Sequence, residues 1–244
     1  MRFRRRFSFA FRLLAAGAVC FGAAGLRGQD PSGGDAAPPP NGAHIAFHFE
    51  NQQLQPAKYA FVIFENGSGQ FHSEPADIPL ASTASYEPLA RAEDRSVQLS
   101  RPVVDQIFST ARAQKFFAIP CEAKDKVAFQ GTKQLSYQGP DGSGSCTYNW
   151  SKIAGIQKIT STFESIALTL EEGRRLAVEH KHDRLALDAE LGFLLEAVKD
   201  GRATEVQTIQ PVLQEIADDE AVLDRARTRA KKLLGDGSST ASLR

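Results

Sequence analysis

Residues 133–150 constrain the fold of this chain more than any other stretch, because they read as two short strands joined by a tight turn. Polar and apolar side chains alternate on both sides of a Pro-Asp-Gly-Ser-Gly sequence, which is the pattern of a β-hairpin. Cys146 lies in the second strand, and Cys121 lies 25 residues upstream. We therefore expect a hairpin that is tied to the preceding segment by a Cys121–Cys146 disulfide.

The N-terminus has the composition of a secretory signal peptide. Residues 1–12 carry five arginines and no acid, and residues 13–26 form an uncharged apolar run that ends in small side chains. This run is shorter than the roughly 20 residues that a membrane span needs. We expect residues 1–28 to be a signal peptide and the protein to be exported, to the periplasm or the extracellular space.

Three alternatives to this route stay open. One is a retained N-terminal anchor. Residues 4–7 partly resemble a twin-arginine signal, and Cys20 is a position for lipidation, although Gly-Ala-Val precedes it instead of the expected Leu-containing pattern. Export favours a disulfide over a catalytic thiol, because exported proteins meet oxidising conditions and the two later cysteines lack Cys-x-x-Cys spacing.

Removal of residues 1–28 changes the charge of the chain. That segment holds six of the 29 basic residues and no acid, so 23 basic and 29 acidic residues remain, a net charge of −6. A mildly acidic protein has no electrostatic footprint for nucleic acid and no polybasic segment for anionic lipid. We therefore expect no nucleic-acid partner and no stable membrane span after signal removal.

The first half of the mature chain reads as strands with one helix. Residues 29–43 form a Pro/Gly-rich flexible linker. Residues 44–50 alternate as a half-buried strand, and residues 59–64 read as a central strand that turns at Asn66-Gly67 into residues 70–73. After a long loop over 74–94 come a short strand at 96–99 and a helix that Ser100 caps.

From residue 153 the pattern becomes helical. Apolar residues at i, i+3 and i+4 spacing continue for some 25 residues, with Gly173 as a candidate break. Further helices are expected over 185–199 and over 204–216, where Pro211 kinks or restarts the helix. Asp218-Asp219 would cap a last helix that ends at Leu234, and residues 235–244 read as a disordered tail.

These elements predict an α+β fold. Residues 44–180 are expected to form an antiparallel sheet built from two hairpins with packed helices, and residues 181–234 a C-terminal helical bundle. The two glycine-rich turns are similar, and each is followed by a strand and later by a helix. A duplicated ββα unit and convergent turn chemistry both explain this similarity.

The middle of the chain resembles a family of small bacterial exported domains of unknown function. The residues that carry the resemblance are the Tyr-x-x-x-Ile-x run of residues 59–64, the turn at Gly67, the following strand and helix, and Phe116-Phe117. The family likewise combines a hairpin, a helix ending in an aromatic pair and a second hairpin. The resemblance covers residues 58–166, and it implies an exported α+β domain without an activity or a catalytic residue to transfer.

The best polar cluster is formed by His180, His182 and Asp183. Imidazole and carboxylate groups suit zinc, but no further ligand with the usual spacing follows, and a connection between two helices has the same composition. His44 and His48 share a strand face about 13 Å apart, too far to bind one metal ion. No cofactor and no metal site is therefore predicted, and the three residues named first stay low-ranked metal candidates.

Other candidate groups have structural explanations. Glu171, Glu172 and Glu196 lie among basic residues of helices, so we expect them on solvated, ion-paired faces. Tyr137, Tyr148 and Trp150 are either a ligand platform or core residues beneath the following helix, and core packing is favoured. No catalytic residue is predicted.

The sequence thus favours a non-catalytic, exported binding module whose C-terminal helices contact another envelope or secreted protein. One alternative is a hydrolase whose site residues are scattered along the chain. Another is a cell-envelope assembly or stability factor.

Overall fold

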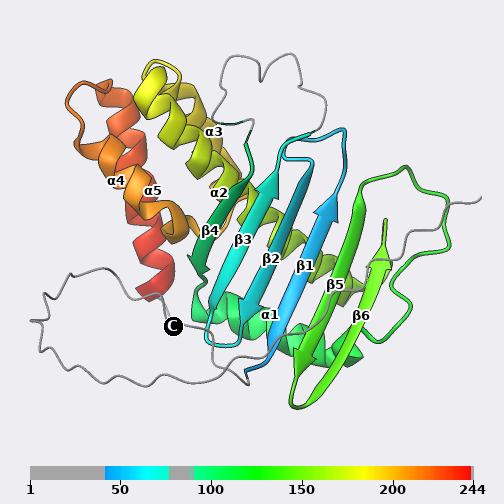
Figure 1. Ribbon diagram of the computed structural model, residues 1–244. Coiled ribbons are helices and arrows are strands. Elements are labelled where there is room, and N and C mark those ends of the chain that lie inside the picture. The colour runs from blue at the N-terminus through cyan, green and yellow to red at the C-terminus, as the bar shows by residue number, and fades with distance from the viewer. Residues whose placement is uncertain (1–41, 77–88, 90, 243–244) are drawn as a thin grey trace, which may run out of the picture. The chain divides into compact units, whose positions relative to one another are not determined.

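The computed structural model describes residues 42–76, 89 and 91–242 (Figure 1). The expected signal peptide (1–28), nearly all of the expected linker (29–43) and residues 77–88 and 90 of the expected loop lie outside this range. None of the helices in the described part of the chain is both long enough and apolar enough to cross a membrane.

The sheet has six antiparallel strands in the order β4-β3-β2-β1-β5-β6, which confirms the predicted α+β class. β1 lies between the hairpins β2–β3 and β5–β6, and its Phe47 is paired with Phe61 on one side and Leu135 on the other. The strands are β1 His44–Glu50, β2 Lys58–Phe64, β3 Ser68–Glu74, β4 Glu93–Gln98, β5 Thr132–Gly139 and β6 Gly142–Tyr148.

Five α-helices and two short 3₁₀ turns complete the described chain. α1 and α2 lie behind the sheet in Figure 1, and the other three helices gather beyond β4. The helices are α1 Arg101–Ala113, α2 Ala154–His182, α3 Leu187–Lys199, α4 Gln210–Asp218 and α5 Asp224–Ser242, and the 3₁₀ turns are η2 Lys115–Phe117 and η3 Val206–Ile209.

The helix boundaries differ from the expected ones at three places. α2 continues through Gly173 without a break, and this glycine lies close against Ile209. Asp219 ends α4, and α5 begins only at Asp224. α5 then runs to Ser242 and so includes most of the segment expected to be a disordered tail.

The core lies on one face of the sheet. Every second side chain of β1 and β2 is buried there, and Phe163 of α2 stacks on Phe47 with ring centroids 5.0 Å apart. Burial of aromatic side chains of this size contributes strongly to stability. The opposite face is rich in Ser, Thr, Gln and His, and no helix of the described residues covers it.

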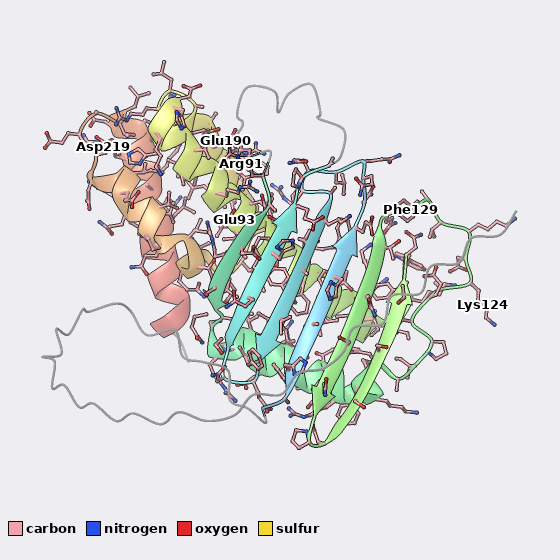
Figure 2. The ribbon with its side chains drawn as sticks, viewed as in Figure 1. Arg91, Glu93, Lys124, Phe129, Glu190 and Asp219 are labelled. Carbon is pink, nitrogen blue, oxygen red and sulfur yellow. A yellow bond between two sulfur atoms is a disulfide. The ribbon has the colours of Figure 1, made fainter. Side chains whose placement is uncertain are left out.

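The predicted disulfide is present. Cys121 and Cys146 are both buried, and their Cα atoms lie 5.8 Å apart, which is the usual spacing for a disulfide. The bridge lies beneath β6 and fixes the start of the long loop that leads into β5. Lys124 and Phe129 project from this loop (Figure 2).

The sheet and the C-terminal helices share one continuous hydrophobic core. Glu205 accepts hydrogen bonds from the backbone N–H and the hydroxyl of Ser100, at 2.6 and 2.7 Å. Ser100 therefore precedes α1 as expected, but its side chain bonds Glu205 and not the helix backbone. The expected boundary between residues 180 and 181 falls inside α2, so this helix belongs to both predicted parts.

Candidate functional site: a basic groove between helices α3 and α5

The residues that the sequence named as metal candidates lie at the C-terminal end of α2. His180 Nε2 lies 2.8 Å from Asp219 Oδ2, and Arg184 lies 3.3 Å from the same oxygen. The other oxygen of Asp219 accepts the N–H of Ala221, and this bond, with that of His180, lowers the pKa of the Asp219 carboxyl. The cluster thus fastens the end of α2 to the α4–α5 connection, where Figure 2 labels Asp219.

The other two metal candidates do not join this pair. His182 is exposed, and the backbone N–H of Asp183 ends α2 by bonding the carbonyl of Glu179. Within the described residues, no group of three or more His, Cys, Asp or Glu side chains is arranged to hold a metal ion. The geometry thus gives the metal hypothesis no support.

The histidines of β1 lie on the uncovered face of the sheet. His48 is exposed, and the ring of His44 lies 5.7 Å from that of Phe64. A third histidine on this face, His72 of β3, was not singled out from the sequence. It bonds Asp94 at 2.8 Å and Glu74 at 3.3 Å, and these bonds raise the pKa of its imidazole.

The aromatic residues of the second hairpin are core residues. Tyr137 and Tyr148 are buried, and their hydroxyls bond Asp141 and Thr160, both at 2.5 Å. Their rings therefore pack inside the protein and do not form an exposed ligand platform. Trp150 is partly buried just after β6.

Lys133 is a buried cation that the sequence did not reveal. Its ammonium donates to the backbone carbonyls of Asn149, at 3.2 Å, and Gln130, at 3.4 Å, and lies 5.4 Å from the Phe49 ring centre. Burial lowers the pKa of this ammonium. The Lys133 side chain thus provides hydrogen bonds to two loop carbonyls at the end of the sheet, and we assign it a structural role.

The prediction that Glu171 and Glu172 lie on a solvated face is wrong. Glu172 is only 5% exposed, and burial raises the pKa of its carboxyl to about 7. Glu171 is largely buried and lies 3.6 Å from Arg174. It is therefore ion-paired, as predicted, but it does not lie on a solvated face. The prediction failed because distant segments cover both residues: Glu172 lies near Glu190 of α3, and Glu171 lies near Glu93 of β4. Glu196 is exposed, as expected.

A second charged cluster lies where β4 meets α2. Arg174 is buried, lies 3.2 Å from Glu93 and donates to the backbone carbonyl of Arg91 at 2.5 Å. Figure 2 shows Arg91 and Glu93 at this junction. The cluster joins the sheet edge to α2.

A concave site, a groove of about 810 Å³, lies between α3 and α5. α3 contributes residues spaced by three or four positions, which places them on one face of the helix. α5 contributes two basic residues spaced by three. The groove is lined by Ala189, Gly192, Phe193, Leu195, Glu196, Val198, Lys199, Arg202, Arg229 and Lys232.

Asp188 fixes the two walls of the groove relative to each other. This carboxylate on α3 pairs with Arg225 of α5 at 2.5 Å and with Arg229 at 2.9 Å. Arg229 also donates to the backbone carbonyl of Asp188. Its guanidinium lies against Gly192, where a Cβ would come within 2.8 Å of it. The absence of a side chain at Gly192 therefore lets α5 approach α3 closely.

An aromatic side chain and exposed cations lie on the groove surface. Phe193 is 40% exposed, and the guanidinium of Arg202 lies 5.4 Å from its ring centre. Lys199 and Lys232 are exposed and have no ion-pair partner in the part of the chain that the structure describes. The groove therefore offers an apolar contact flanked by positive charge.

The sequence contained one signal for this groove. Phe193 interrupts the polar face of α3, and a large apolar residue on such a face often marks a contact surface. The partner wall could not be assigned, because the register between α3 and α5 is set by Asp188 and not by a local pattern.

No protein-family model and no curated protein matches this chain. The resemblance of residues 58–166 to a family of exported domains therefore stays a prediction.

Proposed function

We propose that this chain is an exported, non-catalytic binding module that contacts another envelope or secreted protein through the groove between α3 and α5. The observation that carries this function is the exposed Phe193 in a groove that also contains Lys199 and Lys232, neither of which has an ion pair among the described residues. An aromatic contact surrounded by cations has the composition of a recognition surface.

Two further observations support the proposal. The N-terminal composition and the Cys121–Cys146 disulfide both fit an oxidising compartment outside the cytosol. The polar side chains that could otherwise take part in chemistry make structural contacts. His180 pairs with Asp219, and Asp188 joins α3 to α5.

Affinity purification with matched charge variants tests this function. Mature protein used as bait in an envelope extract of the native cells should retain one specific protein at moderate salt. Lys232→Glu should lose it, whereas Lys231→Glu should retain it, because Lys231 is exposed on α5 but does not line the groove.

Equal recovery with both variants would contradict the proposed surface. Turnover in a hydrolase screen that disappears on His180→Ala or His182→Ala would contradict the non-catalytic assignment and favour the hydrolase alternative.

A further inference from the structure

We propose that the α3–α5 groove binds an acidic amphipathic helix of the partner protein, with carboxylates on both edges of that helix and an apolar side chain between them. This inference rests on the function proposed above and adds the chemistry of the partner.

The length of the groove fits a helical segment. Its wall on α3 runs from Ala189 to Lys199, a distance of about 15 Å at 1.5 Å per residue, or nearly three helical turns. Ala189 is small and exposed, so it leaves room for a ligand beside α3, whereas the space at Gly192 is taken by Arg229. A helix laid in a groove between two helices is a recurring mode of peptide recognition.

The charges of the groove select an acidic ligand. Four of its ten lining residues are basic and one is acidic. Arg229 is already engaged by Asp188, and Arg202 has only a 3.6 Å contact with Asp200. Lys199 and Lys232 have no ion pair among the described residues, so they are available to carboxylates of a partner.

The positions of these cations favour an amphipathic ligand. Lys199 and Arg202 line the groove on the α3 side and Lys232 on the α5 side, and the apolar lining residues Phe193, Leu195 and Val198 all come from α3. A helix with acidic residues on both flanks of an apolar stripe complements this arrangement. The partly exposed Phe193 then gains burial on binding, and burial of an aromatic side chain is a common source of interface affinity.

An anionic membrane surface complements the site less well. A bilayer surface is flat on this scale, whereas the cations and Phe193 line a concave groove. The mature chain also has an expected net charge of −6, which opposes approach to anionic lipid. A folded helix can enter the groove and contact both walls at once.

Selection from a displayed library of helical peptides, about 18 residues long, identifies the preferred chemistry without a known partner. The bait is the complete mature chain, and its folding and that of each variant are checked by circular dichroism. Enriched peptides are synthesised with a fluorescent label, and their affinity is measured by fluorescence anisotropy against the wild type, Lys199→Glu/Lys232→Glu, Phe193→Ala and the matched control Lys231→Glu.

We expect the enriched peptides to carry an excess of Asp and Glu around apolar residues spaced by three and four positions. Their affinity should fall at least about tenfold for Lys199→Glu/Lys232→Glu, because two attractive charge pairs become repulsive. It should fall several-fold for Phe193→Ala and change less than about twofold for Lys231→Glu. Higher salt should weaken binding to the wild type.

Other outcomes separate the two proposals. Enriched peptides without an acidic excess that still depend on Phe193 would overturn the acidic-helix inference and leave the groove as a binding surface. Peptides insensitive to every groove variant, or no enrichment, would overturn both. If the protein binds phosphatidylglycerol vesicles and Lys199→Glu/Lys232→Glu abolishes this binding, the ligand of the groove is an anionic membrane surface and the helix inference is wrong. If the protein forms a concentration-dependent dimer that Phe193→Ala disrupts, the groove contacts a second copy of this chain and the partner-helix inference is wrong.

Discussion

The buried carboxyls of Glu172 and Glu179 should make this protein more stable in mild acid than in mild base. Both lie on α2, both are only 5% exposed, and each has a side-chain oxygen without a hydrogen-bond partner in the described structure. Burial is the main reason that the pKa of each carboxyl is raised to about 7, and the neighbouring Glu190 raises it further. Arg175 opposes this shift, but it lies 3.6 Å from Glu190 and serves that carboxylate as well.

The direction of the effect follows from the two pKa values. In the unfolded chain a glutamate releases its proton near pH 4.5, and in the folded protein these two release theirs near pH 7. Their contribution to stability is therefore complete below pH 4.5 and is lost as the pH rises through 7. At 1.36 kcal/mol for each tenfold difference in proton affinity, the loss for one isolated carboxyl is on the order of 3 kcal/mol by about pH 8.

Substitution by glutamine isolates this contribution, because glutamine keeps the shape of the protonated acid. Glu172→Gln and Glu179→Gln should each raise the free energy of unfolding by about 2–3 kcal/mol near pH 8 and by less than about 1 kcal/mol near pH 5. Urea unfolding followed by circular dichroism at both pH values measures the difference. The control Glu215→Gln changes an exposed glutamate of α4 and should have little effect at either pH.

Comparison of each variant with the wild type at the same pH removes the contributions of the other titrating groups. A stabilisation that is equal at both pH values would refute ionisation as its cause. Destabilisation near pH 8 would show that these carboxylates are charged and favourably paired in the folded protein.

Two further predictions concern the architecture. Cys121→Ser/Cys146→Ser should lower the free energy of unfolding by about 3.5 kcal/mol, because the bridge spans 25 residues; a loss below about 1 kcal/mol in urea unfolding would show that the bridge adds little. Gly173→Ala should destabilise the protein by about 1–3 kcal/mol, since the new methyl group would collide with Ile209. Gly235→Ala, where α5 has open space, should instead stabilise it by up to about 1 kcal/mol; the same sign for both changes would contradict the close packing at Gly173.

The sequence predicted the sheet well because its signals are local. Alternation over residues 44–50 and the turn at Asn66-Gly67 appear in the structure as β1 and the β2–β3 connection. The Cys121–Cys146 bridge could be predicted because only two cysteines remain after the expected signal peptide. None of these inferences needs knowledge of distant contacts.

The parts that failed depend on contacts between distant segments. Glu172 looks like a surface residue until α3 is placed against α2. The sequence predicts Ser100 as a helix cap, but its hydroxyl donates a hydrogen bond to Glu205, which lies 105 residues further along the chain. Asp219 looks like the start of a helix, yet its side chain bonds His180 and the N–H of Ala221. The groove was missed for the same reason, because it exists only after α5 packs on α3.

Photo-crosslinking in the native cells tests the central claim, that the α3–α5 groove contacts a partner protein. A photoreactive phenylalanine analogue replaces Phe193, and the same analogue at Leu185, which is more exposed but lies outside the groove, serves as the control. We predict a discrete crosslinked product from position 193 that is absent from position 185 and disappears on Lys232→Glu. Equal products from both positions, or a product from position 185 alone, would contradict the assignment of the groove as the binding surface.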